Sequence, residues 1–270
     1  MTISLDRPDR PVSVVAPDPA VRWLAVLALA LGGFGIGTTE FVAMGLLPDI
    51  ASSLGITEPT AGHVISAYAL GVVIGAPIIA ALAARVPRKT LLLTLMAVFT
   101  LGNLASVLAP SYETLMIARF VAGLPHGAYF GVAALVATHL MGRHNRAKAV
   151  AHVMCGLTVA TVIGVGIASW LGQALGWRSA FALVVAIGAI TMTALWFWLP
   201  ARLRSMHVTS PLTELGALKR VQVWLALAVG MIGFGGMFAV YTYISTTMTD
   251  VAGLPARWFH WRSWSSVSAW

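Results

Sequence analysis

Long apolar runs separated by short polar segments dominate this chain. Seven runs are long enough to cross the hydrocarbon layer of a bilayer as helices, which takes about 20 residues each. They lie at 23–47, 61–84, 90–109, 113–137, 149–173, 179–199 and 222–247. The first run is too long for a signal peptide and is predicted to be the first membrane span. The pattern therefore predicts an all-α membrane protein.

Composition narrows the class further. Hydrophobic residues make up 59% of the 270 residues and charged residues only 10%, whereas about a quarter of a soluble domain is charged. The net charge of +8 does not indicate a nucleic-acid partner, because the basic residues sit in short loops between apolar runs. The single cysteine, Cys155, excludes a disulfide framework and a thiolate metal site. We expect no cofactor and no metal.

The basic residues alternate between successive loops. They gather in the N-terminal tail and in the second, fourth and sixth connections: Arg7, Arg10, Arg22, Arg85, Arg88, Lys89, Arg143, Arg146, Lys148, Arg202, Arg204, Lys219 and Arg220. The positive-inside rule then predicts a cytoplasmic N terminus in a cell (inner) membrane. Residues 1–22 become a cytoplasmic tail, 200–221 a cytoplasmic linker and 248–270 an outside tail.

The fourth run carries an arginine, Arg119, about one and a half turns from its start. An arginine inside a bilayer is costly unless it faces a protein interior or water, so it is a candidate functional group. The alternative is a side chain that snorkels to the outer interface. Three glycines spaced four apart, at 123, 127 and 131, favour close helix contact, and Pro125 between them predicts a kink.

Glu40 is the only acidic residue inside any of the seven predicted spans. It lies about two turns before the outer end of the first span, where a desolvated carboxylate is a candidate for proton exchange. The alternative is a structural carboxylate paired with Arg119. Three further polar side chains, Tyr68, His126 and Tyr243, are candidates for lining a substrate path, although helix packing explains the first two as well.

Five stretches of the sequence together form a pattern that is typical of a known protein family. The phrases are GTTEFVAMGLLPDIA, AGHVISAYALGVVIGAPIIA, GNLASVLAPSYETLMIARFVAGLPHGAYFGV, LTVATVIGVGIASWLGQALGWRSAF and MIGFGGMFAVYTYI. The chain resembles the major facilitator superfamily, and within it the drug:proton antiporter group with its arabinose-efflux permeases and chloramphenicol-resistance exporters. The likeness covers roughly residues 23–254.

The resemblance implies a fold and a mechanism. Residues 23–199 would form an N-terminal six-helix half built from two inverted three-helix repeats, and 222–247 one further helix. Arg119 matches the arginine that the family associates with proton coupling, so Glu40 and Arg119 would form the proton-coupling pair. The partners would be the lipid bilayer, protons and a small molecule, either a sugar such as arabinose or a drug such as chloramphenicol.

Two family motifs are altered. In the loop after span two, the usual aspartate and glycine correspond to Ala84 and Pro87, and the gating loop keeps only Arg85, Arg88 and Lys89. This change weakens the expected charge relay at the inner face. The span-five packing motif has three members, Gly156, Gly164 and Gly166, the last standing where proline is expected. We therefore expect a closely packed but less kinked helix, which puts tight control of proton leak in doubt.

The end of the chain departs from the twelve-span family pattern. After Leu254 the composition shifts abruptly, and the tail contains Trp258, Trp261, Trp264 and Trp270. It is too short and polar for an eighth span. A frameshift or premature stop explains it, and a short amphipathic anchor is the alternative. We expect such a truncated chain not to transport alone, and either to be degraded or to self-associate.

Other classes of function fit the residues less well. A retinal-based pump needs an intramembrane lysine, and the seventh run has none. A seven-helix receptor matches the number of spans but not the loop charges and the family phrases. An intramembrane enzyme is not expected, because no His/Glu pair has zincin spacing and no Ser/His/Asp set shares one depth.

Overall fold

The structure is a computed structural model that describes residues 19–82, 86–200 and 219–242, together with the single residues 247, 251 and 253. Regular structure in these residues is helical, with no strand among them. The principal helices are α1 (Pro19–Gly45), α2 (Leu47–Leu54), α3 (Glu58–Leu82), α4 (Arg88–Leu108), α5 (Tyr112–Gly123), α6 (His126–Met141), α7 (Arg146–Val159), α8 (Val165–Leu175), α9 (Trp177–Trp198) and α11 (Val221–Thr242).

Seven segments among the described residues are long and apolar enough to span a membrane, as predicted. They are Ala20–Gly45, Glu58–Ile79, Arg88–Leu108, Tyr112–Met141, Arg146–Leu175, Trp177–Trp198 and Val221–Val240. Their bounds differ from the predicted ones by a few residues at most ends. The short helix α2 was not predicted, because its eight residues follow the first span after only one intervening residue.

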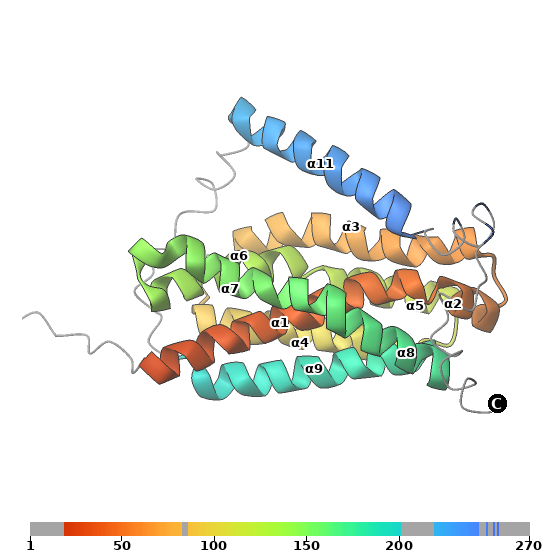
Figure 1. The fold of residues 1–270 in the computed structure, drawn as a ribbon, viewed down its shortest axis with the longest axis horizontal. Helices are drawn as coiled ribbons and strands as arrows, with labels where there is room; N and C mark the ends of the chain where they lie inside the picture. Colours follow the sequence, from red (N-terminus) through yellow and green to blue (C-terminus); the bar gives the residue numbers. More distant parts are fainter. Residues whose placement is uncertain are drawn as a thin grey trace, which may run out of the picture.

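The first six spans form one bundle in which spans that follow each other along the chain run in opposite directions (Figure 1). Spans one and five, and likewise spans two and four, therefore run in the same direction, and contacts between their starts agree with this. At one end Trp23, near the start of α1, packs edge-on against His152 of α7. At the opposite end the Tyr112 hydroxyl at the start of α5 lies 3.1 Å from His63 Nδ1 of α3. The fold is thus a six-helix bundle plus one further helix, the architecture that the resemblance predicts.

Glycines bring α3 against the backbone of α5. A Cβ atom added at Gly71 would lie 2.2 Å from the Phe120 carbonyl oxygen, and one at Gly75 would lie 2.1 Å from the Leu124 carbonyl oxygen. A Cβ at Gly123 would in turn lie 2.2 Å from the Tyr68 carbonyl oxygen. Only residues without side chains permit such contact, which is the small-residue packing typical of membrane helices.

Two spans are interrupted near their middle. The fourth span breaks between α5 and α6 at Leu124 and Pro125, which confirms the kink predicted at the proline. The fifth contains a π-helical turn, η3 (Ala160–Gly164), between α7 and α8. This distortion arises without the proline whose absence led us to expect a less kinked helix. A π turn of this kind is frequent at functional sites.

The seventh span, α11, lies obliquely beside the six-helix bundle (Figure 1). One contact between them is a stacked pair of rings, Phe238 on α11 and Phe41 on α1, with centroids 5.6 Å apart. The window of α11 that qualifies as a span has no buried residues, whereas half of the α1 window is buried. The candidate site is therefore built from the six-helix bundle.

Candidate functional site

Arg119 is a fully buried side chain inside the bundle. Its Nη1 donates a hydrogen bond to Thr39 Oγ1 at 2.8 Å, and its Nη2 donates to the Thr39 carbonyl oxygen at 3.1 Å. The guanidinium carbon also lies 4.4 Å from the ring centroid of Tyr68 and 5.2 Å from that of Phe181. Two neutral oxygens and two aromatic rings thus surround the cation, a setting that favours a desolvated charge.

Glu40 follows Thr39 directly on α1, and its side chain is partly exposed. The charge of Arg119 acts electrostatically on the carboxylate. Among the described residues, however, no ion pair joins the two side chains within 4.0 Å. The arginine is therefore held by the residue beside Glu40 rather than by Glu40 itself.

Tyr68 connects Arg119 to His126. One face of its ring lies against the guanidinium, and its hydroxyl lies 3.0 Å from His126 Nδ1. The His126 ring also packs against Phe130, with centroids 5.4 Å apart. Tyr68 is buried and His126 is partly buried, so the two candidates for the substrate path contact each other. The third, Tyr243, lies outside the described residues.

Sequence reasoning missed Tyr129. Its hydroxyl donates to the Leu29 carbonyl oxygen at 2.9 Å, and the side chain is fully buried between α6 and α1. It fits there because residue 32 is glycine: a Cβ at Gly32 would lie 2.0 Å from the Tyr129 hydroxyl oxygen. The spacing of these residues gives no local signal, since the contact joins positions about 100 residues apart.

The predicted gating loop is described only in part. Arg85 lies outside the described residues, and Arg88 begins α4. The Nζ of Lys89 donates to the carbonyl oxygens of Trp196 at 2.6 Å and Leu199 at 2.7 Å. Because these carbonyls close the C-terminal end of α9, the ammonium stabilises the negative end of that helix dipole.

The span-five glycines have different surroundings. A Cβ at Gly156 would lie 1.9 Å from the Ala30 carbonyl oxygen, and one at Gly164 would lie 2.3 Å from Thr38 Oγ1. Both positions therefore pack directly against α1. A Cβ at Gly166 would meet nothing within 4 Å among the described residues. The close approaches that these glycines allow between the fifth span and α1 thus lie before and within the π turn.

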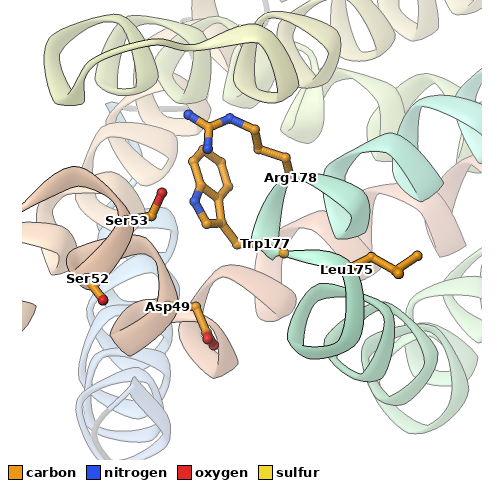
Figure 2. Close-up of a pocket in the computed structure, with 7 residues that line it drawn as sticks. Asp49, Ser52, Ser53, Leu175, Trp177 and Arg178 are labelled. Atoms are coloured by element: carbon orange, nitrogen blue, oxygen red, sulfur yellow. The ribbon is translucent and has the colours of Figure 1, made fainter.

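A surface pocket of about 310 Å³ lies at the end of the bundle opposite Lys89, away from the Glu40–Arg119 region. Figure 2 shows Trp177 and Arg178 at its centre, with the guanidinium over the indole ring. Arg178 Nη2 donates to the Ala109 carbonyl oxygen at 2.7 Å, which ties the start of α9 to the end of α4. The rest of the lining is Asp49, Ser52, Ser53, Leu175 and Gly176.

Within the described part of the chain, no group of three His, Cys, Asp or Glu side chains comes together in a way that could hold a metal ion. The polar interior of the bundle consists instead of one guanidinium, one carboxylate, hydroxyls, an amide and an imidazole. Of these groups, the carboxylate and the imidazole can bind and release protons, and the hydroxyls and the amide can form hydrogen bonds.

Comparison with known proteins agrees with this architecture. The Major Facilitator Superfamily model matches residues 29–269. The inner membrane transport protein YdhP of Escherichia coli strain K12 is 46% identical over 226 residues, which cover 84% of this chain and 58% of that protein. The putative transporter AraJ of the same strain is 40% identical over 228 residues, with the same two coverages.

A third relative, the chloramphenicol resistance protein of Streptomyces lividans, is 37% identical over 238 residues, 87% of this chain and 61% of its own length. The chain thus spans about three fifths of the curated relatives that it matches. Among solved structures, a D-xylose–proton symporter superposes with a TM-score of 0.64 over 88% of this chain and 64% of the other, at 16% identity. That likeness concerns the fold alone. The chain belongs to the Major Facilitator Superfamily, a family of membrane transporters.

Proposed function

We propose that this chain takes part in proton-coupled efflux of a small molecule across the cell membrane, and that Glu40 carries the proton. The observation that supports this role is the arrangement of Glu40 and Arg119. Both lie inside the six-helix bundle, yet the guanidinium finds its hydrogen-bond acceptors on Thr39 and forms no ion pair with Glu40. A carboxylate without a permanent cationic partner can bind and release a proton during a transport cycle.

The proposed orientation places the starts of α1, α4 and α7 on the cytoplasmic side. The loop charges favour it through the positive-inside rule. Glu40 then lies toward the outer half of the membrane and would take up a proton from outside. The positive charge of Arg119 would favour the ionised form of Glu40. Protonation of Glu40 would then affect Tyr68 through its ring contact with Arg119, and His126 through its hydrogen bond with Tyr68.

The proposed substrate is a small sugar or an amphiphilic drug. The name of one relative, a chloramphenicol resistance protein, supports the drug class. The sugar class rests on the resemblance of this chain's own phrases to those of arabinose-efflux permeases. The interior polar groups near Glu40 are mostly neutral hydrogen-bonding side chains, which suits an uncharged solute with hydroxyl or amide groups.

The test is a chimera that joins residues 1–220 of this chain to the second half of the Streptomyces chloramphenicol resistance protein. We expect everted vesicles that contain the chimera to accumulate chloramphenicol when a proton gradient is imposed. The Glu40→Gln variant should lose at least tenfold of that rate, because glutamine cannot exchange a proton.

The matched control is Glu113→Gln, which removes a carboxylate at the start of α5 that is fully exposed. It should transport at the rate of the parent chimera. Gradient-driven accumulation that survives in Glu40→Gln at the parental rate would exclude Glu40 as the proton carrier.

A further inference from the structure

Thr39 bonds differently from the other threonines in these helices. A threonine inside a helix usually donates its hydroxyl to the carbonyl four residues earlier. The residues that do so here are Thr38, Thr100, Thr138, Thr191 and Thr193. Thr39 instead donates its hydroxyl to Asn103 Oδ1 on α4, at 2.6 Å. Its bond to another helix therefore takes the place of the local one that its neighbour Thr38 makes.

This bond determines what Arg119 can find on α1. A hydroxyl has one proton to donate and two lone pairs that accept. Because the proton of Thr39 points to Asn103, its lone pairs are available to Arg119 Nη1, which donates at 2.8 Å. The Thr39 carbonyl accepts from Nη2. One residue thus supplies both acceptors, and both are uncharged.

Asn103 is itself held in place. It is fully buried, and its Nδ2 donates to the Phe99 carbonyl oxygen at 2.8 Å, so its Oδ1 faces Thr39. The neighbouring Gly102 lets α4 and α5 pack closely, since a Cβ there would lie 2.6 Å from the Ala122 nitrogen. The relative heights of Asn103 and Arg119 are therefore set by direct contact between their helices.

We propose that Thr39 and Asn103 are positioning residues that hold the Arg119 guanidinium on neutral oxygens and so keep it from forming a fixed ion pair with Glu40. This inference rests on the proposed function, in which Glu40 exchanges a proton. Among the described residues, two titratable side chains interact electrostatically with Glu40: Arg119 on α5 and Tyr68 on α3. The Thr39–Asn103 bond sets the distance at which the first of them acts, and Coulomb energy varies with that distance.

The experiment uses the whole 270-residue chain, purified and reconstituted in lipid vesicles. Infrared spectroscopy detects the carbonyl band of a protonated carboxyl group, and its loss in Glu40→Gln assigns that band to Glu40. The pH at which the band is half lost is then measured in each variant. We expect Thr39→Val, which is isosteric but has no hydroxyl, and Asn103→Leu each to move this pH by about one unit.

Two further variants separate positioning from packing. Thr39→Ser keeps the hydroxyl and should restore the parental value. Thr191→Val makes the same change at another fully buried threonine, whose hydroxyl bonds only to Ile187 of its own helix, and should leave the value unchanged. A packing defect would move the Thr191→Val value as much as the Thr39→Val value.

The outcomes distinguish the two proposals. If no band disappears in Glu40→Gln, the proposed proton-carrying role fails. If the band is present but Thr39→Val and Asn103→Leu keep the parental half-loss pH, the positioning role is overturned while Glu40 stands. If neither variant folds while Thr39→Ser and Thr191→Val do, the pair serves folding, and the positioning role is also overturned.

Discussion

At the scale of single residues, Lys89 illustrates how a charge at the membrane boundary stabilises the bundle. Its ammonium closes the last turn of α9 through two carbonyl bonds. Replacing it in Lys89→Met keeps most of the apolar stem but leaves these carbonyls without their cation. We expect a loss of about 1–2 kcal/mol in the free energy of unfolding, measured by denaturant titration in detergent micelles.

The adjacent Arg88 provides the control for that prediction. It begins the same helix, but among the described residues its side chain makes no hydrogen bond to α9, unlike that of Lys89. Arg88→Met removes an equal charge at the same depth, so its unfolding free energy should stay within about 0.5 kcal/mol of the parent. Equal losses in both variants would mean that net charge, rather than the α9 bonds, accounts for the effect.

Residue-scale chemistry could be predicted from sequence only where a group is out of place. Arg119 and Glu40 are charged residues inside apolar runs, so the cost of burial singles them out. Asn103 is a buried amide within an apolar run, and it bonds to a neighbouring helix. That its partner is Thr39, and that Thr39 also receives Arg119, depends on how three helices pack. No local pattern records a contact between positions 64 or 80 residues apart.

At the scale of helices, small residues determine how closely the spans approach. Gly71 of α3 faces a backbone carbonyl of α5, whereas Gly131 of α6 is exposed and a Cβ there would meet nothing within 4 Å among the described residues. Gly71→Ala should therefore destabilise the bundle by about 1–3 kcal/mol, because two backbones must separate. Gly131→Ala should be neutral or stabilise by up to about 1 kcal/mol, since alanine favours helix.

Both alanine variants can be compared by the fraction that remains folded as a strong detergent is added. Similar unfolding curves would show that the α3–α5 approach does not limit stability. The same comparison tests the prediction of close helix contact, which was based on glycine spacing alone. Spacing placed Gly123, Gly127 and Gly131 on one face, but only the packed helices show that the first two have close neighbours and the third does not.

Helix positions were more predictable than helix irregularities. Apolar length alone located the seven spans, because each must satisfy its backbone hydrogen bonds within itself when it crosses lipid. Pro125 predicted the break in the fourth span, because proline removes a backbone hydrogen-bond donor. The π turn in the fifth span has no such residue. It lies between Gly156 and Val165, where α1 packs against the helix, and no residue type at these positions marks it in the sequence.

At the scale of the whole molecule, alternating loop charge leads to a prediction of topology. Single cysteines introduced at positions 88 and 146, after Cys155→Ser, should react with a membrane-impermeant thiol reagent only when the membrane is opened. A cysteine at position 113, at the other end of the bundle, should react from outside in intact cells. Labelling of position 88 or 146 in intact cells would reverse the proposed orientation.

The second prediction at this scale concerns transport by the chain alone. In inverted-repeat transporters the substrate site lies between two halves that rock against each other, and this chain spans about three fifths of its matched relatives. We expect the 270-residue chain to give no chloramphenicol tolerance in an efflux-deficient host. Co-expression with the second half of the Streptomyces relative should restore it. Tolerance from the chain alone would show that one half, or a self-associated pair, suffices.

The break at Leu124 and Pro125 divides the fourth span into two separate helices, α5 and α6. Helix α5 carries Arg119 and packs against α3 and α4, whereas α6 carries His126 and Tyr129 and packs mainly against α7. A tilt of α5 can therefore shift the guanidinium without turning α6 by the same angle. Tyr68 contacts Arg119 with its ring and His126 with its hydroxyl, so it connects α5 and α6 across the break. A change in the angle between the two helices therefore alters the contacts of Tyr68.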